Sequence, residues 1–479
     1  MKIEKNTLFY GDNLPILRNY VEDESIDLIY LDPPFNSQRS YNIIFKERTG
    51  NESPAQIKAF DDFWRWDRAT EETYREIADS APANVVRLIK AFVDFLGRND
   101  VTAYVVMMTI RLLEFHRVLK KTGSIYLHCD PTASHYLKIV MDQIFDARHF
   151  RREVIWRTGG VSGFKSRAKN WVRNHDVLLY FTKSDYFTFN KLYMPHPKDY
   201  ERRGGGEQPK GVAIDDVWAD IYSPYIMSFS KEKLGYQTQK PLDLLRRIIK
   251  ASSNEGDWVL DPFCGCGTTI IAAHELGRHW IGIDITHLAV SLMKYRLNDM
   301  FGDIDYDVIG EPVDLPSARA LAEEDPWQFQ WWALSLVKGR PVGSTRKKGA
   351  DKGVDGVIYF IDEENGKPKE VVIQVKSGHV GVQQLRELCT TVNDRNAALG
   401  VFITLEDPTG PMRRQALAQG YYERPGFQKK YPKIQILTIQ ELLAGRQVEM
   451  PFPESKKHVS FEKAKPQKKK PEDFTEKLL

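Results

Sequence analysis

Residues 258–284 read WVLDPFCGCGTTIIAAHELGRHWIGID. The apolar runs Trp258–Leu260 and Trp280–Ile283 are predicted to be short buried strands, with a helix over IIAAHEL between them. The glycines of the first turn let the backbone come close to a ligand. Asp284 ends the second strand 23 residues after Asp261, close to the roughly 20 that separate such a turn from an acid that binds a ribose hydroxyl. The stretch therefore predicts a cofactor site.

The same turn argues against two other kinds of site. A nicotinamide-binding turn normally carries a third glycine, and Ile270 occupies that position here. Cys264 and Cys266 do not indicate zinc, because no CxxC pair or histidine cluster accompanies them.

Strand-like runs alternate with helical patterns over the rest of the first domain. Further strands are predicted at Leu8–Tyr10, Ile26–Leu31, Ser124–His128, Val154–Trp156 and Val177–Phe181, and helices at Val101–Lys120, Thr132–Phe145 and Pro241–Ser252. This alternation is typical of a mostly parallel, doubly wound sheet. The predicted fold class is α/β.

The segment Asp32-Pro33-Pro34-Phe35 follows directly after the predicted strand IDLIYL. Open α/β sheets bind ligands at the carboxyl ends of their strands, which is where Asp32 stands. The prolines lack a backbone N–H, so nearby carbonyls are left to face a pocket. Asp32 and the Pro33 carbonyl are suited to accept the two hydrogens of a substrate amino group, and Phe35 to stack on an extruded base. A plain strand-terminating turn is the other interpretation.

Together these motifs resemble the N6-adenine/N4-cytosine DNA methyltransferases. The catalytic motif at 32–35 precedes the cofactor loop at 261–269, which is the order of the beta class of that family. Gly11-Asp12-Asn13, GSIYLHCD at 123–130 and Gln239-Lys240-Pro241 also match, and the resemblance covers about residues 5–297. It implies a Rossmann-like sheet with insertions.

The resemblance also implies a cofactor, a substrate and a set of site residues. The cofactor is S-adenosylmethionine, bound by Asp12, Lys240, Asp261, Phe263, Gly265, Gly267, Thr268 and Asp284. The catalytic residues are Asp32, Pro33, Pro34 and Phe35. The substrate is double-stranded DNA, methylated at adenine N6, because an aspartate at the head of this motif is usual for adenine and a serine is more frequent for cytosine N4. Relatives of this class are often dimers, so a homodimer is expected.

Two long segments interrupt the alternation of strands and helices. Residues 42–100 include FDDFWRWD, and residues 157–235 combine glycines, basic residues and aromatic residues. Insertions this long are usually functional. We predict that they recognise the DNA target, because their Arg, Lys and aromatic side chains are suited to contact base edges and phosphates. Solvated insertions that stabilise a dimer are the alternative.

A second constellation lies near the C-terminal end. Asp355 precedes the predicted strand VIYFI, and VVIQVK ends at Lys376. A two-residue turn at Asn365-Gly366 would place Asp355 opposite Lys376, with Gln374 on the same face as Lys376. A carboxylate, an amide and an ammonium at one strand edge are suited to hold Mg²⁺ and polarise a phosphodiester. An ordinary hairpin with edge-protecting charges is the other interpretation.

GADKGVDG, VVIQVKSG, GVFITL and QILTIQELL resemble, in this order, the Mrr-like restriction endonucleases of the PD-(D/E)xK superfamily. The resemblance implies a nuclease site of Asp355, Gln374 and Lys376, with Mg²⁺ bound by Asp355 and Gln374. Where that family tends to carry a glutamate on the preceding helix, this chain has Gln330.

The composition is that of an ordinary globular protein. The 479 residues are 42% hydrophobic and 28% charged, which suits two or three domains. The net charge of +3 equals the surplus of the lysine-rich stretch after residue 450, so bulk charge does not indicate a nucleic-acid partner. Four cysteines are too few for a disulfide framework. There is no apolar leader and no run of 18 apolar residues, so we expect a cytoplasmic protein without a membrane span.

The predicted organisation is a methyltransferase domain at 1–302, a linker at 303–324, a smaller restriction-endonuclease-like α/β domain at 325–446 and a basic disordered tail at 447–479. The leading hypothesis is a single-chain restriction–modification protein. One alternative is a methyltransferase, for adenine N6 or cytosine N4, whose C-terminal domain only binds DNA. Another is a methyltransferase for RNA or a protein amide.

Overall fold

The computed structural model describes residues 3–34, 40–46, 52–61, 65–130, 133–159, 169–196, 211–222, 239–342, 353–360, 369–423 and 429–451. Its largest unit is a nine-stranded sheet in the order β10-β6-β7-β5-β2-β11-β12-β1-β13. The strands are β1 (Thr7–Tyr10), β2 (Ile26–Leu31), β5 (Leu119–Cys129), β6 (Phe150–Arg157), β7 (His175–Thr182), β10 (Val217–Trp218), β11 (Trp258–Asp261), β12 (His279–Asp284) and β13 (Asp307–Ile309). Neighbours run parallel, except that β7 is antiparallel to β5 and β6. The prediction of a mostly parallel sheet is confirmed.

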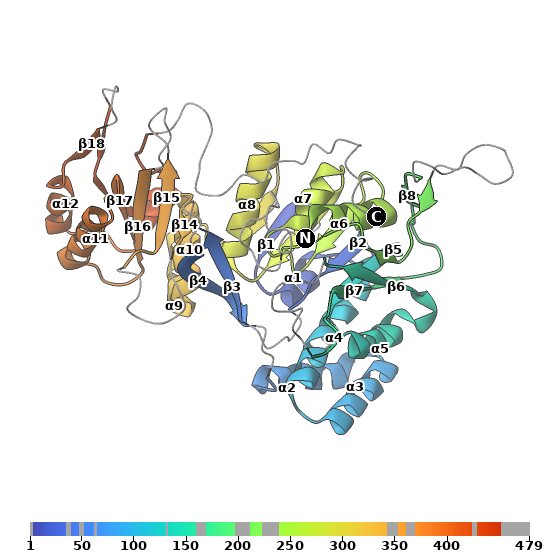
Figure 1. Cartoon of the computed structure of the whole chain (residues 1–479). Coiled ribbons are helices and arrows are strands. Elements are labelled where there is room, and N and C mark those ends of the chain that lie inside the picture. The colour runs from blue at the N-terminus through green and yellow to red at the C-terminus, as the bar shows by residue number, and fades with distance from the viewer. Residues whose placement is uncertain are drawn as a thin grey trace.

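Helices cover both faces of this sheet (Figure 1). One face carries α1 (Asn13–Tyr20), α2 (Arg68–Ser80), α3 (Ala83–Leu96), α4 (Asp100–Val118) and α5 (Ser134–Phe145), and the other carries α6 (Leu242–Ser252), α7 (Thr268–Glu275) and α8 (His287–Phe301). Successive residues of a strand point to opposite faces. Ile29 accordingly packs into the core on the first face, and Leu28 and Tyr30 into the core on the second. Burial on both faces explains why the strands are nearly continuous apolar runs.

The two predicted insertions differ in how they join the fold. Within 42–100, β3 (Ser40–Lys46) and β4 (Glu52–Asp61) form a separate two-stranded sheet, whereas α2 and α3 contribute to the first core through Ile77, Val85 and Ile89. In the described parts of 157–235, β8 (Tyr193–Met194) pairs with β9 (Val212–Ala213), and β10 extends the large sheet.

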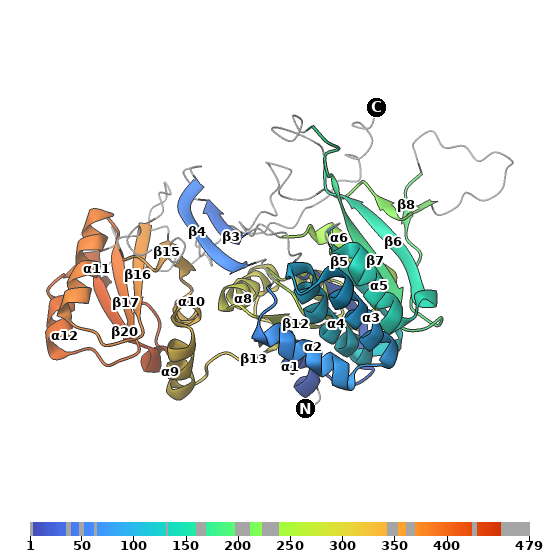
Figure 2. The same cartoon turned by 90° about the horizontal axis from the view of Figure 1, so that it is seen from below.

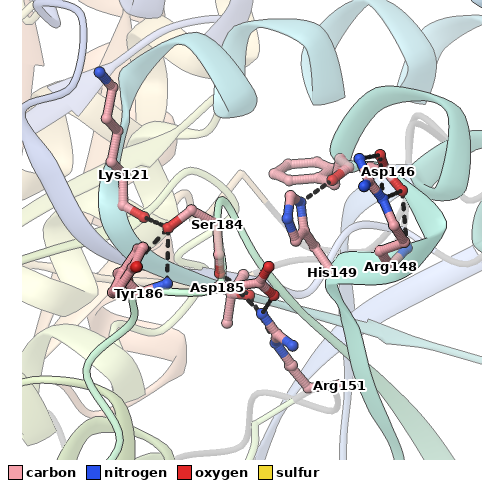
Figure 3. Close-up of polar contacts among 10 residues, drawn as sticks. Lys121, Asp146, Arg148, His149, Arg151, Ser184, Asp185 and Tyr186 are labelled. Atoms are coloured by element: carbon pink, nitrogen blue, oxygen red, sulfur yellow. Dashed lines mark hydrogen bonds and ion pairs between the residues drawn. The ribbon is translucent and has the colours of Figure 1, made fainter.

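Local ion pairs and hydrogen bonds fix one end of the strands of the large sheet, at the turn before β6 and just after β7 (Figure 3). Arg151 donates to Asp185 Oδ1 at 2.9 Å, and Ser184 Oγ donates to the Lys121 carbonyl at 2.8 Å. Asp146 pairs with Arg148. Lys121 stands near the amino end of β5, which runs parallel to β2. These contacts therefore lie at the end of the sheet opposite the carboxyl ends of the central strands.

The expected linker at 303–324 is largely built into the fold. β13 adds to the edge of the sheet beside β1, and α9 (Leu315–Glu324) begins with a capping box between Asp314 and Ser317. Neither β13 nor α9 was predicted from this polar sequence. An edge strand needs few apolar residues, and α9 buries only Ala318, Leu321 and Ala322.

The C-terminal domain is a five-stranded sheet in the order β14-β15-β16-β17-β20 (Figure 2). Its strands are β14 (Arg340–Pro341), β15 (Gly356–Phe360), β16 (Lys369–Lys376), β17 (Leu399–Thr404) and β20 (Ile434–Thr438); α10 (Pro326–Leu336), α11 (Val382–Asp394), α12 (Gly410–Leu417) and α13 (Ile439–Leu443) pack on them, and β18 (Tyr421–Glu423) pairs with β19 (Lys430–Pro432). Separate apolar cores lie on the two faces of the sheet.

The predicted register of the β15–β16 hairpin is wrong by two residues. The observed pairs run from Gly356↔Ile373 to Phe360↔Lys369, which places Asp355 opposite Gln374 and not opposite Lys376. The predicted turn at Asn365-Gly366 lies outside the described residues. A shift of two residues keeps every side chain on its face, so the apolar pattern does not distinguish the two registers.

The first residues of the predicted tail are ordered into the C-terminal core. Val448 and Met450 are buried, and the Gln435 side chain pairs with the backbone of Glu449 at 2.6 and 2.8 Å. Residues 452–479, where the rest of the predicted tail falls, lie outside the described residues. None of the described helices is long and apolar enough to cross a membrane.

Candidate functional site

A cavity of about 880 Å³ opens at the carboxyl ends of β1, β2, β11 and β12. Ten predicted site residues line it: Asp12, Asp32, Pro33, Pro34, Lys240, Asp261, Phe263, Gly265, Thr268 and Asp284. Gly267 stands behind the wall, where its φ of +75° starts α7 and a Cβ would meet Met293 Cγ at 2.5 Å. Phe35 lies outside the described residues. The fold thus brings the Asp-Pro-Pro turn and the glycine-rich loop to one cavity.

Asp284 holds the glycine-rich loop in place from the neighbouring strand. Its Oδ2 accepts from the Gly265 N–H at 2.9 Å, and its Oδ1 accepts from the N–H and Oγ1 of Thr286, both at 2.9 Å. The Cys264 N–H donates to the Ile283 carbonyl at 3.1 Å. These bonds fix the loop backbone where it faces the cavity.

Buried carboxyl groups give the cavity its electrostatic character. Burial raises the pKa of Asp261 to about 7, against hydrogen bonds from Thr269 and the Phe263 N–H and with help from the charges of Asp32 and Asp284. Burial likewise raises the pKa of Asp284, although hydrogen bonds from Thr286 and Gly265 oppose it. Buried acids that resist ionisation favour a cationic ligand, which stabilises their charged form.

Lys240 contacts Asp32, the predicted catalytic acid. Its Nζ forms an ion pair with Asp32 Oδ2, and the two side chains are 11% and 16% exposed. The residue thus contacts the Asp-Pro-Pro turn, whereas the sequence analysis predicted that it binds the cofactor.

Arg111 is a pocket residue that the motifs did not reveal. From α4, its Nη2 donates to both oxygens of Asp12, at 2.8 and 2.9 Å, and its Nε donates to Asn13 Oδ1 at 2.7 Å. Asn13 Nδ2 in turn donates to the Pro262 carbonyl at 2.9 Å. This Arg111 clamp joins three segments that are far apart in the chain. Its signal was a single arginine within the otherwise apolar run AYVVMMTIRLL.

The amino end of α2 forms another wall of the cavity. Arg65, Asp67, Thr70 and Thr73 line it, and the Asp67 side chain caps the helix by accepting from the Thr70 N–H at 2.8 Å. Part of the insertion expected to recognise DNA therefore lies beside the cofactor loop.

The predicted nuclease residues lie together on β16 and just before β15. Asp355 Oδ2 accepts from the Val375 N–H at 2.7 Å. Gln374 is 2% exposed, and among the described residues its Oε1 has no hydrogen-bond partner. Lys376 ends β16, two residues further along the same face. Within the described ranges, no three His, Cys, Asp or Glu residues are grouped to hold a metal ion.

Known relatives match between 40% and 64% of this chain. Type II methyltransferase M.BamHI of Bacillus amyloliquefaciens is 29% identical over 64% of this chain and 59% of its own length. Type II methyltransferase M.HpaI of Haemophilus parainfluenzae is 34% identical over 40% of this chain and also 59% of its own length. The chain thus spans about three fifths of each of these relatives. DNA adenine methyltransferase YhdJ of Escherichia coli (strain K12) is 27% identical over 62% of this chain and 83% of its own length.

Among solved structures, a putative DNA modification methylase from Thermus thermophilus, complexed with S-adenosyl-L-methionine, is 15% identical, with a TM-score of 0.36 over 64% of this chain and 99% of the other. Residues 336–444 match a second family, described as NACHT-associated inactive restriction endonuclease 1. Residues 26–294, more than half of the sequence, match the N6/N4 methyltransferase family described as DNA methylase, so the chain belongs to that family.

Proposed function

We propose that this protein transfers a methyl group from S-adenosylmethionine to N6 of adenine in double-stranded DNA. The observation that carries the proposal is the single cavity lined both by Asp32-Pro33-Pro34 and by the loop from Asp261 to Thr268. A methyl donor and an acceptor amino group have to meet within bonding distance, and one cavity with both walls provides for this.

The cavity walls fit this cofactor chemically. S-adenosylmethionine carries a sulfonium and an ammonium group, and the cavity presents the carboxyl groups of the buried Asp261 and the half-buried Asp284. The apolar face of Phe263 and the close backbone at Gly265 suit a flat nucleoside. When bound, this cofactor supplies an electrophilic methyl group.

The chain's own residues would orient the acceptor. Asp32 Oδ1 and the Pro33 carbonyl accept the two amino hydrogens, which aims the nitrogen lone pair at the methyl group. Neither Pro33 nor Pro34 has an N–H that would compete for these acceptors. Lys240 holds Asp32 in place through its second carboxylate oxygen.

The choice of adenine depends on Asp32, the residue typical of adenine enzymes in the resemblance described above. A relative that carries adenine in its name, YhdJ, supports it. The sequence also left cytosine N4, RNA and protein amides open as acceptors, so each of them is an arm of the test.

The test is to incubate unmodified plasmid with the protein, with and without S-adenosylmethionine, and to sequence single molecules for modified bases. We expect N6-methyladenine at a defined motif, only with the cofactor present. Methylcytosine would change the target base, and unmodified DNA beside labelled RNA or protein would overturn the proposal. Light scattering of the same preparation tests the expected homodimer.

Mg²⁺-dependent DNA cleavage by the C-terminal domain is a second candidate function. One observation favours it: the buried Gln374 Oε1, beside Asp355, offers an unpaired oxygen of the kind that Mg²⁺ binds, as far as the described residues go. The chemistry there is weaker than in the cofactor cavity, since Asp355 also receives the Val375 N–H and the matching family is described as inactive. DNA binding without cleavage is the competing proposal.

Incubation of the plasmid with and without Mg²⁺ separates these proposals. Cleavage that is lost in Asp355→Ala and Lys376→Ala, with methylation retained, would establish a nuclease and the restriction–modification hypothesis. If the wild type leaves DNA of every methylation state intact but still binds it through this domain, the domain is a DNA-binding module.

A further inference from the structure

Two buried polar side chains and a partly exposed one form a line across the large sheet next to the cavity. Tyr30 on β2, His128 on β5 and Asp176 on β7 belong to three adjacent strands. Tyr30 Oη lies 2.9 Å from His128 Nδ1, and His128 Nε2 lies 3.3 Å from Asp176 Oδ2. Tyr30 is 2% exposed and His128 is 0% exposed. Burying these polar groups is costly unless each is paired, so their alignment is a specific feature of the fold.

The chemistry of the outer end fixes the direction of the hydrogen bonds. Burial works to raise the pKa of Asp176, but the His128 hydrogen bond and the charges of Lys240 and Arg173 outweigh it and hold the pKa below its usual value. Asp176 is therefore a carboxylate and can only accept. The neutral tautomer of His128 that donates from Nε2 to Asp176 leaves Nδ1 as the acceptor for the Tyr30 hydroxyl.

The Tyr30 end of this line of side chains lies at the cavity. Tyr30 lines the same cavity as Asp32, and the two residues stand two positions apart, so their side chains lie on the same face. Since the Tyr30 hydrogen points to His128, its oxygen presents lone pairs to the cavity. One oxygen of Asp32 is taken up by the ion pair with the Lys240 ammonium.

We propose that Tyr30, His128 and Asp176 form a proton relay that removes the proton from the target amino group during methyl transfer; this rests on the proposed function. The amino nitrogen forms its bond to the methyl carbon as the sulfur–carbon bond breaks and leaves its electron pair on sulfur. One of the two amino N–H bonds that Asp32 and Pro33 orient breaks as the nitrogen becomes tetrahedral, and that proton goes to the Tyr30 oxygen. The original Tyr30 proton goes to His128 Nδ1, and Asp176 stabilises the resulting imidazolium until a proton passes to water by way of the partly exposed Asp176 carboxylate.

The relay needs no free tyrosinate, because Tyr30 gains one proton as it gives up another. This agrees with the burial and the nearby acids that raise the pKa of Tyr30 far above its usual value. An aromatic amino nitrogen is a poor nucleophile, so removing its proton as the new bond forms accelerates the transfer.

The first variant is Tyr30→Phe, with Tyr126→Phe as its matched control. Tyr126 is also buried and lies opposite Tyr30 in the sheet register, but its hydroxyl pairs with Ser252 Oγ at 2.8 Å and it does not line the cavity. In single-turnover methylation we expect Tyr30→Phe to be about a hundredfold slower, with unchanged cofactor affinity by calorimetry. Tyr126→Phe should stay within about twofold of wild type, because it removes a hydroxyl of equal burial outside the relay.

A solvent isotope effect distinguishes a relay from a structural role. The wild-type single-turnover rate should fall in D₂O, and the remaining rate of Tyr30→Phe should not. A slow Tyr30→Phe that keeps the full isotope effect, or a Tyr30→Phe with the wild-type rate, would overturn the relay. If the wild type itself does not methylate DNA, the proposed function fails instead.

Asp176→Asn decides the matter if Tyr30→Phe does not fold. Arg173 contacts Asp176 Oδ1, so it would keep the amide oxygen there and turn the NH₂ group toward His128 Nε2. His128 would then carry its proton on Nδ1 and donate to Tyr30, whose own hydrogen would point into the cavity and repel the amino group. We expect at least a tenfold slower transfer at unchanged cofactor affinity, roughly, and the wild-type rate in this variant would contradict the relay.

Discussion

The cofactor cavity and the Asp355–Gln374 pair differ in how far along the chain their parts come from. In the cavity, the Arg111 clamp joins α4 to the turns at Asn13 and Pro262. At the C-terminal pair, Asp355 accepts a hydrogen bond from Val375 of its own hairpin. A site assembled from distant segments exists only when the whole domain is folded, whereas a hairpin can keep two polar residues adjacent without any ligand. Convergence of segments is thus the stronger indication of chemistry.

Asp32→Ala tests the cavity most severely. We expect methyl transfer to fall by about a thousandfold, because the acceptor that orients the amino group is lost. Cofactor affinity should change little, since Asp32 is assigned to the base. Single-turnover methylation and calorimetry measure the two quantities on the same preparation.

Asp32→Asn is the control for Asp32→Ala, because it keeps the volume while both variants leave Lys240 without its carboxylate. An equal loss of cofactor affinity and rate in the alanine variant would show that Asp32 belongs to the cofactor site.

Arg111→Ala should have the next largest effect. It leaves Asp12 without its guanidinium and frees Asn13 from α4, so we expect cofactor affinity to fall roughly tenfold to a hundredfold, the equivalent of one or two charged hydrogen bonds. Arg18→Ala is the control, because Arg18 also forms two ion pairs, with Glu76 and Glu114, but does not line the cavity. Equal affinities for the two variants would show that the clamp is not needed.

The fold of the first domain was predictable because its strands are short apolar runs that end at turn-forming residues. The run IDLIYL is buried on both faces and ends at a proline pair, so strand and turn were both evident. The Asp261 loop and Asp284 were predictable for the same reason: they stand at the ends of such strands, and parallel strands place their carboxyl ends together.

The residues that were missed depend on three-dimensional contacts. Arg111 stands in the middle of a helix, and nothing in its local pattern names Asp12 as its partner. The Tyr30–His128 contact needs the β2–β5 register, which places Tyr30 opposite Tyr126. The predicted β15–β16 register was wrong because the apolar pattern is the same in registers two residues apart, so only the turn dipeptide supported it.

Cofactor binding should strengthen with rising pH around neutrality. Burial raises the pKa of Asp261 to about 7, and a cationic ligand binds best to the ionised form. We expect affinity for S-adenosylmethionine to rise about tenfold from pH 6 to pH 8, as the ionised fraction rises from about a tenth to about nine tenths. Calorimetry at three pH values measures it, with adenosine, which carries no charge, as the control ligand.

The same shift has a consequence for stability. A folded-state pKa above the usual 3.8 of an aspartate means that Asp261 favours the folded state most at low pH, and that this contribution is lost as the pH rises toward about 7.

A cofactor affinity that stays flat or falls with pH would show that Asp261 does not face the cationic part of the ligand.

Asp355→Asn should have the smallest effect on methylation. The variant keeps the size of the side chain and an oxygen for the Val375 N–H, and Asp355 does not line the cofactor cavity. We expect the single-turnover methylation rate to stay within about twofold of wild type, as for changes at independent sites. A large loss would mean that the C-terminal domain positions the DNA for methylation. In that case the hairpin pair would belong to the same functional unit as the cavity, and the contrast between a chemical site and a retained local pattern would have to be abandoned.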